Sequence, residues 1–364
     1  MRWTLKPKPE AAKVALLKET LQVDDVVATL LLQRGIETYE AAKTFFRPSL
    51  SDLHDPFLMK DMDKAASRIE AALLQRENIL VYGDYDVDGT SSVALMSSYL
   101  KTRTDNVATY IPDRYDEGYG VSFKGIDFAH DNDFTLIIAL DCGVKAIDKV
   151  AYAKEKGIDF IICDHHRPGN KLPEAVAILD PKRDDCDYPY KELCGCGVGF
   201  KLIQALASKE GKSVEELAEY LDLVATAIGA DIVPITGENR ALAYFGLQVI
   251  NSSPRVGINA LINQVKKEEL TITAGVFIVA PRINAAGRMK HGNYAVTLLT
   301  ETNFGQAQEY AAEIEEFNTD RREADRRITE EALQQIDKQS EQERFTTVVY
   351  HETWHKGVIG IVAS

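Results

Sequence analysis

Three carboxylates stand at alternate positions in one short stretch of this sequence, and their type and spacing suit a metal site. Asp84, Asp86 and Asp88 lie at positions i, i+2 and i+4, so an extended backbone would point their side chains to one side. At such short separation the like charges repel one another and shift one another's pKa values unless a cation lies among them. Carboxylate oxygens are hard ligands of the kind that Mn²⁺ and Mg²⁺ prefer. The stretch therefore predicts a site for a divalent cation.

Two other interpretations of this acidic stretch are open. Residues 84–89 match the opening of a calcium-binding loop, D-x-D-x-D-G, but that loop takes a Glu at its twelfth position and follows a helix. Here the twelfth position is Leu95, and the preceding residues 79–81 form an apolar run typical of a buried strand. A solvated acidic turn is the second alternative, because Asp and Gly are common turn residues. The stretch alone does not exclude it.

More acidic and imidazole groups follow two other strand-like segments, residues 136–140 and 158–163. These groups are Asp141 after the first segment and Asp164, His165 and His166 after the second. In a parallel sheet covered by helices, ligands bind at the carboxyl ends of the strands. Adjacent histidines at such a place can supply both a metal ligand and a substrate contact. We therefore expect these groups to converge with the first three carboxylates.

A further acid, Asp231, is a lone charge in an apolar setting after the helix-like residues 215–229. An unpaired buried charge is unfavourable, so this carboxylate is expected to have a partner or a metal. The alternative is an Asp at a helix end that caps the next turn. Together with the strand-end acids, Asp231 favours the metal interpretation.

The order of the segments predicts an α/β protein with a mainly parallel sheet flanked by helices. Strand-like runs occur at 79–82, 107–111, 136–140, 158–163 and 177–179. Helix-like stretches such as 63–76 and 145–156 separate most of them, and this alternation is typical of a sheet covered on both faces. Residues 1–60 are predicted to form short helices without a chemical motif.

Length and composition place the chain among soluble globular proteins. It has 364 residues, of which 45% are hydrophobic and 27% are charged, as in folded domains. No apolar run approaches the span of a membrane helix, and the first residues lack the apolar region of a signal peptide, so we expect a cytoplasmic protein without membrane association. Cys142 and Cys163 each lie at the end of a predicted buried strand, so packing is their expected role. Cys194 and Cys196 lack a second Cys or His pair at zinc-like spacing, which argues against a zinc site there.

The formal net charge of −14 argues against a nucleic-acid binder whose whole surface is basic. Local basic clusters remain, and they are Arg282, Arg288 and Lys290, and Arg321, Arg322, Arg326 and Arg327. Net charge thus lowers the expectation of nucleic-acid binding without excluding it.

Four motifs in a fixed order, GDYDVDGTSS, LDCG, CDHH and GADIVP, resemble those of the DHH family of phosphoesterases. Four further stretches resemble the branch of that family formed by the bacterial RecJ exonucleases. They are YIPDRYDEGYGVS at 110–122, CGVGFKL at 196–202, PRINAAGRM at 281–289 and WHKGVIGIVAS at 354–364. The resemblance runs from about residue 80 to the last residue.

This resemblance implies a centre of two divalent ions, Mn²⁺ or Mg²⁺. The residues implied as ligands are Asp84, Asp86, Asp88, Asp141, His165 and Asp231. The expected catalytic residues are His166, which would face the substrate phosphate, and Asp164, which would orient its neighbours. Two metal ions can activate a water and stabilise the attacking and leaving oxygens of an in-line displacement at phosphorus. No covalent nucleophile is then required.

The implied activity is a metal-dependent exonuclease that degrades single-stranded DNA in the 5′ to 3′ direction to 5′-mononucleotides, in DNA repair and recombination. The expected substrate contacts are Arg282, Asn284 and Arg288 in a turn of small residues, together with Tyr115, Tyr119 and His355. Arginines can contact phosphates and aromatic rings can stack on unpaired bases. The alternatives are arginines paired with surface acids and tyrosines that belong to the core.

Two other functions are compatible with these motifs. A nanoRNase or nucleotide phosphatase of the same family would share the metal site and act only on very short substrates. A non-catalytic scaffold would bind single strands without hydrolysis. The expected partners are single-stranded DNA and, by resemblance, single-strand-binding protein and a RecQ-type helicase.

The resemblance also predicts how the chain is divided. The expected parts are an N-terminal helical segment at 1–60, a DHH catalytic domain at 61–303 with a sheet part to about 235 and a helical part from about 236, a connector helix at 304–341, and the beginning of a companion substrate-binding domain at 342–364. Residues 345–350 are predicted to form the first strand of the companion. Since the chain stops at Ser364, we expect a truncated or unusually short relative.

Overall fold

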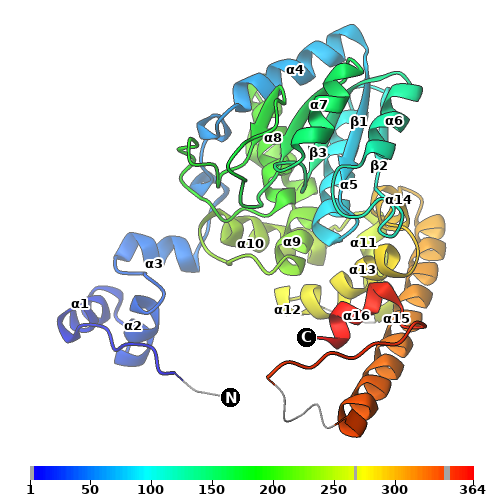
Figure 1. The fold of residues 1–364 in the computed structure, drawn as a ribbon. Helices are drawn as coiled ribbons and strands as arrows, with labels where there is room; N and C mark the ends of the chain where they lie inside the picture. Colours follow the sequence, from blue (N-terminus) through cyan, green and yellow to red (C-terminus); the bar gives the residue numbers. More distant parts are fainter. Residues whose placement is uncertain (1–3, 266–268, 340–344) are drawn as a thin grey trace.

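The computed structural model describes residues 4–265, 269–339 and 345–364, and its parallel sheet lies in the upper part of the view in Figure 1. Five strands lie in the order β2-β1-β3-β4-β5, and every neighbouring pair is parallel. The strands are β1 (Asn78–Gly83), β2 (Val107–Tyr110), β3 (Phe134–Leu140), β4 (Asp159–Cys163) and β5 (Ala177–Leu179). This confirms the predicted α/β class with a mainly parallel sheet.

Helices cover both faces of the sheet. They are α4 (Met62–Gln75), α5 (Val87–Lys101), α6 (Phe123–Asp131), α7 (Ile147–Glu155) and α8 (Gly195–Lys209). Successive strand residues point to opposite faces: Ile79 and Val81 of β1 belong to the core that includes α4, α5 and α8. Leu80 and Tyr82 belong to the second core, formed with α6 and α7. Burial on both faces explains the nearly continuous apolar runs of the strands.

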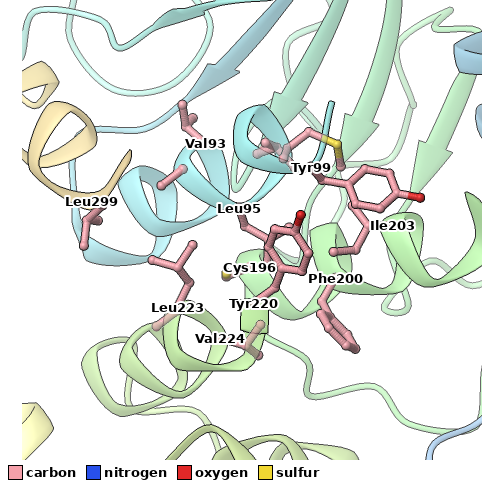
Figure 2. Packing of buried hydrophobic residues seen from close by; sticks show 14 of the residues in the cluster. Val93, Leu95, Tyr99, Cys196, Phe200, Ile203, Tyr220, Leu223, Val224 and Leu299 are labelled. Atoms are coloured by element: carbon pink, nitrogen blue, oxygen red, sulfur yellow. The ribbon is translucent and has the colours of Figure 1, made fainter. Parts of the chain in front are cut away.

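Helix α5 lies at the middle of the larger core (Figure 2). Leu95 and Tyr99 of α5 belong to the same buried cluster as Phe200 of α8 and Val224 of the helix α9 (Leu221–Ala230). Both α5 and α8 begin near the carboxyl ends of the strands. Their packing therefore fixes two helix N-termini at the edge of the sheet where the acidic residues lie.

The second half of the chain is helical. Its elements are η3 (Val214–Tyr220), α9, α10 (Gly237–Ser252), α11 (Val256–Val265), α12 (Ile272–Ala274), η4 (Gly275–Val279), α13 (Ala280–Met289), α14 (Asn293–Thr300), α15 (Phe304–Gln339) and α16 (Lys356–Val362). The long helix α15 packs against α11, α13, α14 and α16 and forms one side of the molecule (Figure 1).

The N-terminal residues form a separate small group of helices. These are α1 (Ala11–Leu21), α2 (Asp25–Leu32) and α3 (Tyr39–Phe46), followed by the short turns η1 (Leu50–Asp52) and η2 (Pro56–Leu58). Asp24 and Thr38 cap α2 and α3 through their side-chain oxygens. Leu17, Ala28 and Leu31 belong to a small core of their own.

Two local predictions are wrong. Residues 281–289 form most of helix α13 and not a turn, because Pro281 lies at the start of the helix, where proline is tolerated, and the small residues allow close packing. A Cβ atom on Gly287 would lie 2.4 Å from the Tyr85 carbonyl oxygen. By contrast, residues 215–229 are helical as expected, as a 3₁₀ segment followed by α9. Residues 345–350 contain no strand; instead, the backbone of Tyr350 bonds to the Gln335 side chain.

No helix in the described part of the chain is long and apolar enough to cross a bilayer. All five cysteines are free and buried, which agrees with the packing role expected for Cys142 and Cys163.

Candidate metal centre and substrate site

The first acidic stretch turns from strand to helix within a few residues. Asp84 directly follows β1 and is fully buried, whereas Asp86 is the N-cap of α5 and accepts a hydrogen bond of 3.0 Å from the Gly89 amide. Because α5 begins at Val87, Asp88 lies in its first turn. The prediction that one extended backbone aligns all three side chains is therefore wrong for Asp88, since the capping carboxylate starts the helix before that residue.

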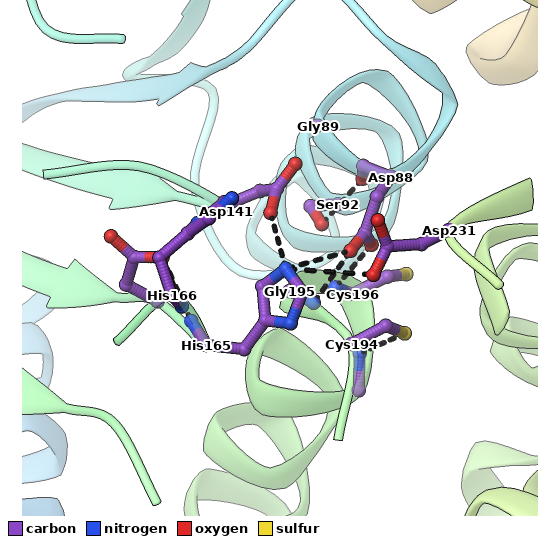
Figure 3. A network of polar contacts seen from close by, with 12 residues as sticks. Asp88, Gly89, Ser92, Asp141, His165, His166, Cys194, Gly195, Cys196 and Asp231 are labelled. Carbon is purple, nitrogen blue, oxygen red and sulfur yellow. Dashed lines mark hydrogen bonds and ion pairs between the residues drawn. The ribbon is translucent and has the colours of Figure 1, made fainter. Parts of the chain in front are cut away.

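His165 lies among the acids that the other segments contribute (Figure 3). Its Nε2 atom is 3.1 Å from Asp141 Oδ1, 3.6 Å from Asp231 Oδ2 and 3.7 Å from Asp88 Oδ2. Two groups of ligand atoms, each within 4.8 Å of one another, share this histidine: one adds Asp141 and His166, and the other adds Asp88 and Asp231. The fold thus brings together residues from the ends of β3 and β4, the start of α5 and the end of α9.

Several polar atoms of this centre are buried without a hydrogen bond. They are Asp84 Oδ2, Asp141 Oδ1 and both ring nitrogens of His165. Buried polar atoms are nearly always paired in proteins, and carboxylate oxygens around an imidazole are the arrangement that a divalent cation satisfies. Burial lowers the pKa of His165 to about 4, so the ring is neutral near neutral pH and can act as a ligand. The residues therefore fit Mn²⁺ or Mg²⁺.

Burial and like charge raise the pKa values of the carboxylates at this centre. Burial, followed by the charge of Asp86, raises the pKa of Asp84 to about 7 and that of Asp231 to about 6. Burial, followed by the charge of Asp231, raises the pKa of Asp88; for Asp141 the second cause is the charge of Asp88. A cation among these groups would favour their charged forms.

Asp164 holds the two histidines in place. One of its oxygens accepts hydrogen bonds from the His165 amide at 2.8 Å and from the His166 amide and ring Nδ1 at 3.1 and 2.8 Å; the other accepts one from the Val144 amide at 2.9 Å. Burial acts to raise the pKa of Asp164, but the hydrogen bonds have the larger effect. The pKa of Asp164 is therefore below its usual value. With Nδ1 engaged, the Nε2 atom of His166 lies 3.1 Å from the Tyr119 hydroxyl.

A row of aromatic and cationic side chains leads away from His166. The Tyr119 ring lies edge-on to the Tyr85 ring at 6.2 Å, and the Arg114 guanidinium lies over the Tyr85 ring at 4.6 Å from its centre. Tyr85 and Arg114 are not among the substrate contacts expected from the sequence. The available signal was position, because Tyr85 stands between two of the acids and Arg114 directly precedes Tyr115.

The row continues to the start of α16. The Tyr115 hydroxyl donates a hydrogen bond to the Arg288 carbonyl, and the Tyr115 ring lies edge-on to the His355 ring at 5.9 Å. The Arg288 guanidinium donates to the Gly357 carbonyl at 2.9 Å. Burial, followed by the nearby charge of Arg114, lowers the pKa of Arg288. The positive charges of Arg114 and Arg288 along this row provide a suitable environment for a phosphate.

The other two predicted substrate residues lie on α13. Arg282 forms an ion pair with Glu315 of α15, with 2.5 Å between Nε and Oε2, and donates to the Ile278 carbonyl at 2.7 Å. This agrees with the alternative in which an arginine pairs with an acid of the protein. Asn284 is half-buried, one helical turn before Arg288. The structure therefore groups Tyr115, Tyr119, Arg288 and His355 near the acidic centre and pairs Arg282 with another helix.

Comparison with known families and proteins agrees with this geometry. Residues 78–228 match the model of the DHH family, N-terminal domain. The chain is 41% identical, over all of its length, to 46% of a single-stranded-DNA-specific exonuclease RecJ of Bacillus subtilis. It is 36% identical, over 84% of its length, to 56% of the protein of that name from Escherichia coli. The chain spans about half the length of the curated relatives it matches.

The chain is also similar to solved RecJ structures. The chain is similar over all of its length to 51% of a RecJ crystal structure in complex with Mn²⁺ from Thermus thermophilus, with a TM-score of 0.85 and 29% identity. It is similar over 86% of its length to 78% of a crystal structure of exonuclease RecJ bound to manganese, with a TM-score of 0.78 and 32% identity.

Proposed function

The chain belongs to the DHH family, in its RecJ branch, and from that premise we propose that it is a metal-dependent exonuclease that degrades single-stranded DNA from the 5′ end. The observation that carries the proposal is the convergence of Asp88, Asp141, His165 and Asp231 around buried atoms without hydrogen bonds. Hydrolysis of a phosphodiester bond is the chemistry for which such a set of ligands is suited.

The six proposed metal ligands are Asp84, Asp86, Asp88, Asp141, His165 and Asp231. When bound, a pair of divalent ions activates water and stabilises the attacking and leaving oxygens of an in-line displacement. The residues of the chain do the remaining work. Asp164 fixes the ring of His166 through the bond to Nδ1, and the bond raises the pKa of His166. In its protonated form, His166 can donate from Nε2 to a non-bridging phosphate oxygen, where negative charge develops.

The row of Tyr119, Tyr85, Arg114 and Arg288 supports an unpaired strand as the substrate. Aromatic rings accept bases of any sequence by stacking, and guanidinium groups contact phosphates. Bases are available for stacking in a single strand, whereas in a duplex they are paired and stacked on one another. By resemblance to the RecJ branch we also propose 5′-mononucleotides as products, a cytoplasmic role in DNA repair and recombination, and single-strand-binding protein and a RecQ-type helicase as partners.

A substrate panel with Mn²⁺ tests the proposed activity. We expect a long single strand labelled at its 5′ end to release labelled mononucleotide, while a blunt duplex of the same sequence stays intact. Degradation of dinucleotides and trinucleotides alone would favour a nanoRNase. Strand binding without hydrolysis of any phosphoester would favour a scaffold and contradict the proposal.

A further inference from the structure

Asp88 is held by the start of a helix that lies 107 positions further along the chain (Figure 3). Its two carboxylate oxygens accept hydrogen bonds from the amides of Gly195 and Cys196, each at 2.7 Å. These amides are the first two of α8, whose N-cap is Cys194. The first amides of a helix have no acceptor within the helix and carry partial positive charge. They therefore stabilise the ionised form of a buried carboxylate.

Gly195 also touches Asp141, on its other side. A Cβ atom at Gly195 would lie 2.6 Å from Asp141 Cβ and 2.7 Å from Asp141 Oδ1, closer than Cβ atoms approach other heavy atoms in proteins. Asp141 is restrained in its turn, because its backbone has a left-handed φ of 59° and its amide bonds to the Cys163 carbonyl at 2.8 Å. Only a residue without a side chain fits between the two acids in this arrangement.

The two acids belong to different groups of candidate ligands. Asp141 lies in one group, Asp88 and Asp231 lie in the other, and His165 is common to both groups. We infer that Gly195 is a positioning residue that sets the separation between the two metal sites: its amide binds the acid of one site, and its Cα packs against the acid of the other. This inference rests on the proposed two-metal centre and assigns a role to the glycine that begins α8.

The next glycines of α8 show what a packing role looks like. A Cβ atom on Gly197 would come no closer than 3.4 Å to Leu193, and one on Gly199 would lie 3.2 Å from Leu140. Both neighbours are apolar side chains, and neither distance involves a candidate ligand. Gly199→Ala is therefore the control, because it makes the same substitution in the same helix away from both acids.

Titration of metal-free protein with Mn²⁺, without substrate, tests the inference. We expect isothermal titration calorimetry to show two ions bound to the unchanged protein. In Gly195→Ala one of them should bind about 10- to 100-fold more weakly, the size of effect typical for residues that support metal ligands. Gly199→Ala should bind both ions as the unchanged protein does.

Two unaltered sites in folded Gly195→Ala would overturn the inference. Normal binding of two ions by a protein that does not cleave DNA would contradict the proposed function alone.

A second measurement applies if Gly195→Ala does not fold. In ¹⁵N-glycine-labelled, metal-free protein, Asp88→Asn should shift the Gly195 amide resonance, because an amide NH₂ replaces one of the two acceptor oxygens. The resonances of Gly197 and Gly199 should stay in place. An unmoved Gly195 resonance would overturn the inference.

Discussion

Two buried charged clusters of this protein differ in how their polar atoms are paired. In the first, Lys201 Nζ donates to Glu238 Oε1 at 3.0 Å and to the His54 carbonyl at 2.6 Å. Glu238 also accepts hydrogen bonds from the Tyr188 hydroxyl at 2.7 Å and the His54 amide at 3.0 Å. Opposite charges and hydrogen bonds satisfy this cluster within the protein.

The second cluster is the acidic centre around His165, where the charges are alike. Asp84 Oδ2 and Asp141 Oδ1 are buried and have no hydrogen bond. Buried polar atoms without a hydrogen bond are unfavourable, so these atoms are expected to bind a ligand. The polar atoms of Lys201 and Glu238 have partners within the protein, which indicates a structural role. The buried atoms around His165 that lack hydrogen bonds indicate a binding site.

The largest expected effect is on activity. Asp141→Ala should reduce Mn²⁺-dependent hydrolysis of single-stranded DNA to background, because it removes an acid that faces His165, while the unfolding free energy is retained. Initial rates and chemical denaturation measure the two quantities. Asp148→Ala, at an exposed site on α7, is the control and should change neither. Turnover retained by Asp141→Ala at saturating Mn²⁺ would contradict the assignment.

The satisfied cluster should respond in the opposite way. Glu238→Ala leaves the Lys201 ammonium buried without its counter-charge, so we expect a loss of about 3–5 kcal/mol of unfolding free energy. Mn²⁺ affinity should be unchanged in the folded fraction. The double variant Lys201→Met/Glu238→Gln should recover much of the loss, because it removes both charges and keeps an acceptor for Tyr188. Weakened Mn²⁺ binding at unchanged stability would remove the distinction between the clusters.

The stability of the metal-free protein should depend on pH through Asp84. The pKa of Asp84 is about 7 in the folded protein, well above its value in an unfolded chain. The folded state therefore binds the proton more tightly, and this contribution to stability is complete below about pH 4 and is lost as pH rises toward 7. Asp84→Asn should remove this contribution to the unfolding free energy, which is on the order of a few kcal/mol.

Denaturation at several pH values, with and without Mn²⁺, measures the contribution of Asp84. Mn²⁺ should stabilise the protein at pH 7. Parallel pH profiles of Asp84→Asn and unchanged protein would refute the expectation.

The smallest expected effect concerns the substrate row. Arg114 has no ion pair among the described residues, and Arg282 is paired with Glu315. Arg114→Ala should weaken DNA binding and reduce the slope of log affinity against log salt by about one, as expected for one lost phosphate contact. Arg282→Ala should leave the slope unchanged. Fluorescence anisotropy at several salt concentrations measures the slope for both variants. A reduced slope for Arg282→Ala would show that Arg282 contacts the DNA.

Local pattern allowed much of the fold to be predicted. The strand at 177–179 has the predicted bounds, and β1, β3 and β4 lie within two residues of theirs, because buried parallel strands are apolar throughout and short. Residues 281–289, expected to form a turn of small residues, are helical, because proline is tolerated at the start of α13 and small side chains allow close packing. The strand expected at 345–350 is absent, since apolar residues form a strand only when another strand is available for pairing.

The amino-acid sequence shows which acids and histidines follow strands. It thereby predicts that they meet at one edge of a parallel sheet, because strand direction and side-chain period are local properties. How these groups are paired depends on the folded arrangement of the helices: the first amides of α8 bind Asp88, Gly195 lies between Asp88 and Asp141, and Glu315 binds Arg282. These contacts join residues far apart in the chain, and they depend on the packing of whole helices, which no local spacing of residues specifies.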